Sequence, residues 1–123
     1  MSAFDSVSSL DLQRIWDGVH ARVVHGDRLS FSVVELDAYS VVPEHSHEHE
    51  QLGMVLTGSL SFRIGEETQD LGPGAVWSIP SNTPHEVHVG PDGAVVIDVF
   101  APTRDDWREA PQADERTPRW PSV

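Results

Sequence analysis

Apolar and polar residues alternate along most of the chain between about residue 20 and residue 100. This period of two is typical of β-strands that bury one face and expose the other. Leu60, Phe62 and Ile64, for example, share one face of such a strand. The alternation predicts strands over residues 20–25, 29–36, 38–43, 45–57, 60–64, 67–70, 75–79, 85–89 and 94–100.

Clusters of glycine and proline separate several of these strands and predict tight turns between them. The predicted turns are Gly26-Asp27, Gly58-Ser59, Gly65-Glu66, Gly72-Pro73-Gly74 and Gly90-Pro91-Asp92-Gly93. Many short strands with such turns, and little helix, predict an all-β sandwich or barrel. The 123 residues suffice for one domain with one moderate core.

The two ends of the chain depart from the alternating pattern. Ser8 and Asp11 have capping-box spacing before Leu12 and Ile15, which predicts a short helix over residues 9–16, with an irregular arm as the equal alternative. The last residues are rich in proline and charge. We therefore divide the chain into three parts: an N-terminal arm (1–19), a β-barrel (20–101) and a Pro-rich charged C-terminal tail (102–123).

Composition narrows the classes of function. Eight basic residues against 20 acidic ones give a formal net charge of −12, which argues against nucleic acid or an anionic membrane as a partner. The chain has no lysine for a Schiff base and no cysteine for a thiolate or a disulfide. The first twenty residues carry charges and no apolar run, so we expect no signal peptide and a soluble, cytoplasmic protein.

The segment HSHEHEQ at residues 45–51 carries the main chemical signal. In an extended strand, His45, His47, His49 and Gln51 would all point to one face. Neutral imidazole is the commonest metal ligand in proteins, so this row predicts a metal site. Two alternatives remain from the residues alone: a solvated His-rich strand or loop, and a surface tract that scavenges metals.

Two spaced motifs extend this signal. The first is His45-x-His47 followed by Gln51 and Gly58, and the second comprises Gly74, Pro80, Asn82 and His85. Their spacing resembles the two conserved motifs of the cupin superfamily. The resemblance implies a single-domain jelly-roll β-barrel (a double-stranded β-helix) that holds one divalent transition metal, whether Zn, Ni, Fe or Mn. It also implies the ligand set His45, His47, Gln51 and His85.

The sequence departs from the superfamily pattern at three positions. Gln51 replaces a common glutamate, so the ligand set carries no charge and leaves the metal more electrophilic. Asn82 and Tyr39 stand where glycine is usual, and Asn tolerates the same left-handed backbone. His49 lies on the ligand face and is a candidate fifth ligand or acid/base, or a residue that only packs there.

A carboxylate interrupts an apolar strand near the end of the predicted barrel. Asp98 shares a face with Ala94, Val96 and Phe100, and such a carboxylate is costly unless it is paired or functional. Arg104 follows six residues later, so a purely structural Asp98–Arg104 ion pair is one interpretation.

A narrower resemblance offers another interpretation. The run HSHEHEQ, the P-x-N-x-P-H loop and the Asp98-x-Phe100-x-x-x-Arg104 segment resemble the small pectin-degradation cupins, over about residues 20–109. That family converts 4,5-unsaturated uronates into linear keto sugars. The resemblance implies an isomerase or tautomerase, with Asp98 as acid/base, Arg104 as carboxylate clamp and Phe100 as a wall for the substrate. His49 is the further catalytic candidate.

Two functions of other classes stay open. The His/Gln pattern also resembles cupins that act as polyketide cyclases or dioxygenases on aromatic substrates, and some cupins only bind a small ligand. A pocket lined by Asp98 and Arg104 would favour a small carboxylate substrate, and a wholly apolar pocket would favour the aromatic one. By family analogy we expect a homodimer.

Overall fold

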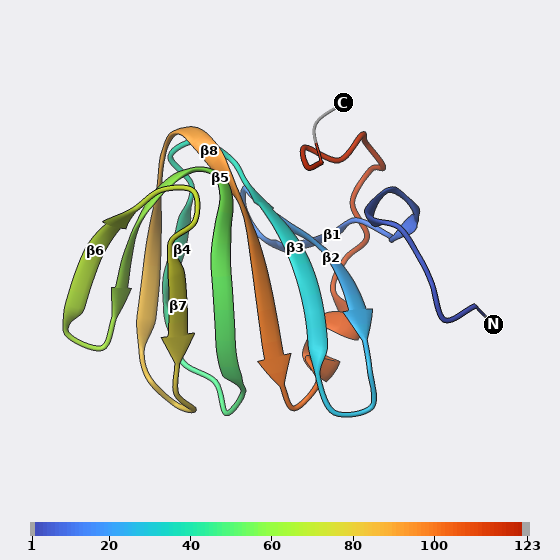
Figure 1. Cartoon of the computed structure of the whole chain (residues 1–123), viewed down its shortest axis with the longest axis horizontal. Coiled ribbons are helices and arrows are strands. Elements are labelled where there is room, and N and C mark those ends of the chain that lie inside the picture. Colours follow the sequence, from blue (N-terminus) through green and yellow to red (C-terminus); the bar gives the residue numbers. More distant parts are fainter. Residues whose placement is uncertain (1, 122–123) are drawn as a thin grey trace.

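The computed structural model describes residues 2–121, and its secondary structure is mostly strand (Figure 1). The strands are β1 (Gln13–Trp16), β2 (Val19–His25), β3 (Ser30–Leu36), β4 (Val41–His45), β5 (Glu50–Ile64), β6 (Glu67–Leu71), β7 (Val76–Ile79) and β8 (His85–Ala101). Two short 3-10 helices, η1 (Val7–Ser9) and η2 (Asp105–Glu109), flank them. Within the described residues, no helix has the length and apolarity to cross a membrane.

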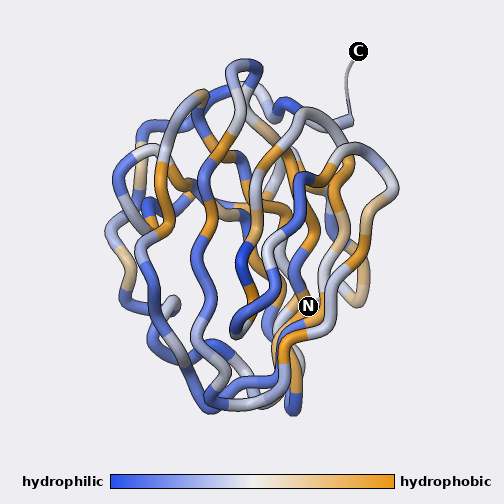
Figure 2. Tube along the Cα trace, turned by 90° about the vertical axis from the view of Figure 1, so that its left-hand side faces the viewer, coloured by the Kyte–Doolittle hydropathy of each residue, from blue (hydrophilic) through white to orange (hydrophobic). Residues whose placement is uncertain are grey.

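All strand pairs are antiparallel. The main path runs β1-β2-β3-β8-β5-β6, while β4 pairs with β8 and β7 pairs with β5. Hydrophobic and hydrophilic stretches alternate along the curled sheet in Figure 2. The inward residues form one cluster that includes Val34, Val55, Phe62, Ile79 and Val96. The predicted all-β jelly-roll barrel is confirmed.

The long strands β5 and β8 pass through two of the predicted turns. Gly58 and Gly93 have φ angles of +81° and +71°, and the pairing of β5 with β8 shifts register around Gly58. A Cβ on Gly58 would overlap the carbonyl group of Gly93. These glycines therefore allow two strands to approach closely and bend. The prediction of turns at 58–59 and 90–93 was wrong.

The predicted strand over 45–57 is also interrupted. β4 ends at His45, residues 46–49 form a connecting segment, and β5 begins at Glu50. Residues 45, 47, 49 and 51 therefore do not share the face of one strand. Two consecutive pairings explain the break: His45 pairs with His85 of β8, whereas Gln51 pairs with Phe100 at the other end of β8.

The N-terminal arm does not form the helix predicted over 9–16. Its residues Gln13–Trp16 instead form β1, an extra antiparallel strand beside β2. A turn at Asp17-Gly18 joins them, and Gly18 has the φ of +74° that favours glycine. Tertiary pairing with β2 has overridden the local capping signal.

The C-terminal tail packs on the arm and the barrel. The backbone amide of Arg14 donates to the Pro111 carbonyl at 2.9 Å, and that of Ala113 donates to the Leu12 carbonyl at 2.8 Å. Trp107 of η2 is buried. The arm and the tail thus lie side by side along one edge of the barrel, as Figure 1 shows.

A buried ion-pair cluster, which we call the Glu35 cluster, fastens the end of the tail. Glu35 and Arg22 are each 1% exposed, with 2.6 Å between Oε2 and Nη1. Arg116 donates to Oε1 at 3.0 and 3.2 Å, and the backbone amide of Arg119 donates to Oε2 at 3.0 Å. The sequence showed no sign of this cluster, because its members are up to 97 residues apart.

Candidate metal centre

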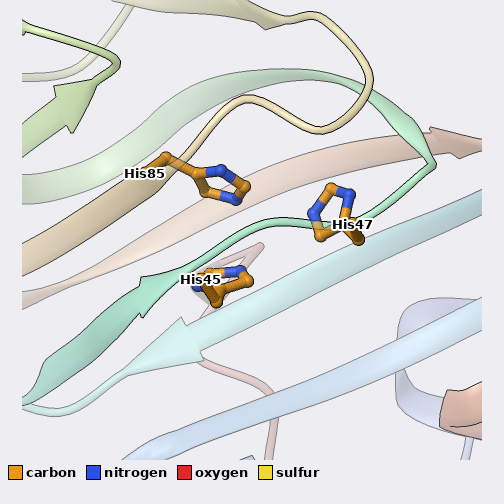
Figure 3. A group of neighbouring side chains, drawn as sticks. All are labelled: His45, His47 and His85. Atoms are coloured by element: carbon orange, nitrogen blue, oxygen red, sulfur yellow. The ribbon is translucent and has the colours of Figure 1, made fainter.

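Three imidazole rings meet at one end of the barrel. His45 is the last residue of β4, His47 lies in the segment that follows, and His85 is the first residue of β8. One nitrogen of each ring lies within 4.8 Å of a nitrogen of the other two. Figure 3 shows the three rings facing a common point. The histidines from the two sequence motifs therefore come together, although they do not lie on one strand.

Backbone carbonyls orient all three rings. Each Nδ1 lies 2.8–2.9 Å from a carbonyl oxygen, that of Pro43, His49 and Thr83 respectively. A carbonyl only accepts, so each Nδ1 carries the proton and each neutral ring presents an Nε2 lone pair. Burial lowers the pKa of all three rings, to about 4 for His85, so they are neutral at pH 7.

Gln51 adds a fourth donor atom. Its Nε2 donates to Asp98 Oδ1 at 2.8 Å, which turns its Oε1 toward His47 Nε2, 3.1 Å away. Both of those atoms are acceptors once His47 Nδ1 holds the proton. Two facing lone pairs repel each other unless a cation lies between them.

His85 gives the same indication. Its Nε2 is buried, and among residues 2–121 it has no hydrogen-bond partner. Leaving such a group unsatisfied costs about 1–3 kcal/mol. Three imidazole lone pairs and one amide oxygen match the ligands that first-row divalent metals take. The cluster can therefore hold such an ion through His45, His47, His85 and Gln51.

Asp98 lies beside this cluster in an almost dry position. Its side chain is 8% exposed, and its Oδ1 accepts hydrogen bonds from Gln51 Nε2 at 2.8 Å and Trp77 Nε1 at 3.0 Å. Burial raises the pKa of Asp98 to about 7, while the two hydrogen bonds and the charge of Arg104 act in the opposite direction. The group can therefore take up and release a proton near neutral pH.

Arg104 does not pair with Asp98. Its guanidinium packs against the rings of both Phe100 and Trp107, 4.6 and 4.3 Å from their centroids. Asp106 accepts from its Nε and Nη2 at 3.1 and 2.9 Å. The side chain is buried yet lines the same pocket as Asp98. The structural Asp98–Arg104 ion pair does not form, and the role of Asp106 was not foreseen.

His49 stands next to the cluster without joining it. Its Nε2 lies 3.1 Å from the Thr103 carbonyl oxygen, and its ring centroid is 5.4 Å from that of His47. The three-histidine group does not include it. Within the described chain its Nδ1 is buried and has no hydrogen-bond partner. Its carbonyl accepts a hydrogen bond from His47 Nδ1 and so helps to position that ring.

The pocket beside the cluster contains about 550 Å³ of space not filled by protein atoms, including its open mouth. Its polar wall consists of His45, Gln51, His85, Asp98 and Arg104. Most of the remaining lining is apolar and belongs to the barrel core. The pocket is therefore amphipathic, because charged and hydrogen-bonding side chains share its wall with apolar ones.

The arm and the tail contribute to this pocket, which the sequence did not reveal. Trp16 of β1 lies with its ring centroid 4.8 Å from that of His45, and Trp107 of η2 lies 5.0 Å from Phe100. Both tryptophans line the pocket. The arm–tail contacts described above hold them in place.

The two residues that stand where glycine is usual in the cupin motifs, Asn82 and Tyr39, both have left-handed backbone conformations. Asn82 has a φ of +63°, the left-handed conformation predicted for it, and its amide donates to the His47 carbonyl at 2.7 Å. The second motif is thereby tied to the first. Tyr39, at the other position where glycine is usual, has a φ of +61°.

The fold and the histidine cluster define a class of protein. The sequence profile of the cupin domain matches residues 32–100. This span covers 69 of the 123 residues and contains the histidine cluster, Gln51 and Asp98. The chain belongs to the cupin family.

Within that family, two similar proteins carry the same name. The pectin degradation protein KdgF of Dickeya dadantii is 28% identical over 97 residues, 77% of this chain and 88% of that protein. The structure of KdgF from Halomonas sp. has a TM-score of 0.79 at 30% identity and covers 86% of this chain and 98% of that one. An RmlC-like cupin from Shewanella frigidimarina, with a TM-score of 0.80 at 21% identity over 86% of this chain and 96% of that one, shares the fold. The predicted resemblance to the pectin-degradation cupins is confirmed.

Proposed function

We propose that this cupin is a metal-dependent isomerase that converts 4,5-unsaturated uronates into linear keto sugars. The observation that carries the proposal is the presence of Asp98 and Arg104 in one pocket with the histidine cluster. The similarity to KdgF of Dickeya dadantii, a pectin degradation protein by name, supports the same substrate class.

His45, His47, Gln51 and His85 would hold the metal, and a bound divalent ion supplies Lewis-acid polarisation of substrate oxygens. The four ligands are neutral. They leave a local positive charge at the end of the pocket in a chain whose formal net charge is −12. An anionic sugar therefore has a favourable place to bind despite the overall field of the protein.

Arg104 would bind the substrate carboxylate. Asp106 occupies the Nε and Nη2 edge of the guanidinium, which leaves Nη1 as the donor for the pocket. Charge-assisted hydrogen bonds to a carboxylate are roughly twice as strong as neutral ones. Phe100, stacked on Arg104, would form the wall against which the sugar ring lies.

Asp98 would carry the proton. In the reaction the hydroxyl of the hemiacetal carbon gives up its proton, the bond from that carbon to the ring oxygen breaks, and the ring oxygen takes up a proton to become the hydroxyl of an enol. That hydroxyl then gives up its proton while a proton adds to the double-bond carbon that carries no oxygen, so a ketone forms and the product is an isomer of the substrate. A carboxyl group with a pKa of about 7 suits both steps. His49, with its buried Nδ1, is the second candidate for this transfer.

Two substitutions test these roles. Asp98→Asn should lower turnover of lyase-generated unsaturated uronates by about 10²–10⁴-fold, because an amide cannot take up the proton. Arg104→Lys should mainly raise KM, because lysine lacks the planar fork. Loss of the double-bond absorbance follows the reaction. The exposed neighbours Asp105→Asn and Arg108→Lys are matched controls and should leave both constants unchanged.

The outcomes separate the parts of the proposal. A wild-type protein that turns over no unsaturated uronate contradicts the substrate class. An active wild type with an equally active Asp98→Asn variant retains the substrate and moves the proton transfer to His49. The apolar lining of the pocket supports a second candidate function, a cyclase or dioxygenase acting on an aromatic substrate. Aromatic substrates would be screened first if the wild type turns over no unsaturated uronate.

The homodimer stays a prediction, and sedimentation would measure it.

A further inference from the structure

Trp77 reaches Asp98 across an intervening strand. Trp77 on β7 and Asp98 on β8 both pair with Gly53 on β5, so the three residues form a row across the sheet. The indole Nε1 donates to Asp98 Oδ1 at 3.0 Å. Strands that are not neighbours in a sheet lie about 10 Å apart, so only a large side chain can span this distance.

Gly53 makes the crossing possible. A Cβ at this position would overlap the indole of Trp77 and come within 2.5 Å of Asp98 Oδ1. The φ of Gly53 lies outside the left-handed region, so the backbone itself does not require glycine here. The absent side chain therefore serves to let the indole and the carboxylate meet.

Two donors act on the same oxygen of Asp98. The Gln51 amide and the Trp77 indole both donate to Oδ1, from β5 and β7 respectively. The carboxylate of aspartate turns freely about its last bond, and its rotamer wells are broad. One hydrogen bond would leave that rotation open, whereas two from different directions define the plane of the group. Oδ2 then remains for the pocket.

We infer that Trp77 is a positioning residue, which together with Gln51 fixes the plane of the Asp98 carboxylate so that Oδ2 faces the substrate pocket. The inference rests on the proposed function for its kinetic consequence. It also explains why residue 51 is an amide. A glutamate there would place a second acceptor 2.8 Å from Oδ1, where Gln51 offers a donor.

The kinetic test is Trp77→Phe, which keeps an aromatic ring against Phe62 and removes the N–H donor. Loss of a partner that orients a reacting group typically costs 10–100-fold in activity. We expect kcat to fall by about 10–100-fold with KM within about twofold and metal content unchanged. Trp120→Phe, in the tail, is the matched control and should leave both constants unchanged. An unchanged kcat in Trp77→Phe, or a loss that lies wholly in KM, overturns the inference.

A spectroscopic test does not depend on activity. The chain has four tryptophans, so a ¹⁵N spectrum shows four indole N–H resonances, and the one missing in Trp77→Phe belongs to Trp77. Asp98→Asn retains an oxygen acceptor and should leave this resonance near its wild-type position. Asp98→Leu, of similar shape and suited to an apolar strand, should shift it upfield. An unchanged resonance in Asp98→Leu overturns the inference.

Glycine substitutions give an independent check on the crossing. Gly53→Ala should shift the Trp77 resonance and lower the melting temperature, whereas Gly72→Ala should do neither, because nothing lies within 4 Å of its Cβ position. A Gly53→Ala protein with wild-type resonance and melting temperature contradicts the inference. If the wild type turns over no uronate, the proposed function fails, and the resonances alone decide whether Trp77 positions Asp98.

Discussion

The molecule contains two interior polar clusters that differ in how far the protein satisfies them. In the Glu35 cluster, each carboxylate oxygen accepts two hydrogen bonds, all from arginines. In the candidate metal centre, His85 Nε2 has no partner in the described chain, and His47 Nε2 faces another acceptor. Both clusters are costly to bury. The first is complete without a ligand and serves stability, whereas the second is complete only when something binds.

The largest expected effect comes from breaking the satisfied cluster. Glu35→Ala leaves Arg22 buried without its counter-charge, and we expect a loss of about 3–5 kcal/mol in the free energy of unfolding. Chemical denaturation followed by tryptophan fluorescence measures this. A loss below about 1 kcal/mol would show that water or rearranged side chains replace the carboxylate.

The second largest effect is expected when a divalent metal binds the histidine cluster. A divalent metal at 100 times its Kd should stabilise the fold by about 2.7 kcal/mol, because it binds the folded chain only. Thermal melts with and without chelator measure the difference. His85→Ala should abolish it, while His88→Ala, an exposed histidine on the same strand, should retain it. A chelator-insensitive melt, with metal loss shown by elemental analysis, would mean that the centre does not contribute to stability.

Acid should weaken the satisfied cluster. Burial alone would raise the pKa of Glu35, but hydrogen bonds from the Arg119 backbone and from Arg22 and Arg116 hold it below its ordinary value of 4.5. The unfolded chain therefore takes up this proton first, so the contribution is complete above pH 4.5 and is lost as the pH falls through the lowered pKa. The free energy of unfolding, measured from pH 6 downward, should fall less steeply in Arg116→Ala than in the wild type. The reason is that this variant lacks one of the hydrogen bonds that lower the pKa of Glu35. Equal slopes in the two proteins would contradict this.

The smallest effect is expected at the rim of the same cluster. Asp37 bonds Arg119 where both side chains are well exposed. Exposed ion pairs contribute about 0–1 kcal/mol, so Asp37→Asn should change the free energy of unfolding by no more than that. This variant is the control for Glu35→Ala, since it removes a carboxylate from Arg119, which also contacts Glu35. A loss as large as that of Glu35→Ala would remove the distinction between buried and exposed pairs.

Local pattern and motif spacing were enough to predict the barrel and the histidines that meet in it. The prediction that one strand carries these residues was wrong, yet His45 and His47 meet His85, and Gln51 Oε1 lies 3.1 Å from His47 Nε2. Period-two alternation reports only which residues face inward. It says nothing about where a strand breaks or which strands become neighbours.

The features that could not be predicted from the sequence depend on which strands and segments become neighbours. Trp77 belongs to the core, but its hydrogen bond to Asp98 depends on the register of three strands. Arg104 bonds Asp106 rather than Asp98, because Asp106 lies two residues further on in the first turn of η2. Arg22 and Glu35 are buried together, and Arg116 and Arg119 of the tail contact them there. Each of these features arises from contacts that alternation does not encode.

The carbonyls that orient His45 and His85 in the candidate metal centre have an evolutionary consequence. His45 and His85 each bond the carbonyl of the residue two positions earlier, Pro43 and Thr83. Every amino acid supplies a main-chain carbonyl, so substitutions at these two positions leave the acceptor in place as long as the backbone keeps its path. Side-chain substitutions at these two positions therefore do not disturb the orientation of the rings. Residues 43 and 83 can therefore change during evolution while the imidazole rings of His45 and His85 keep their orientation.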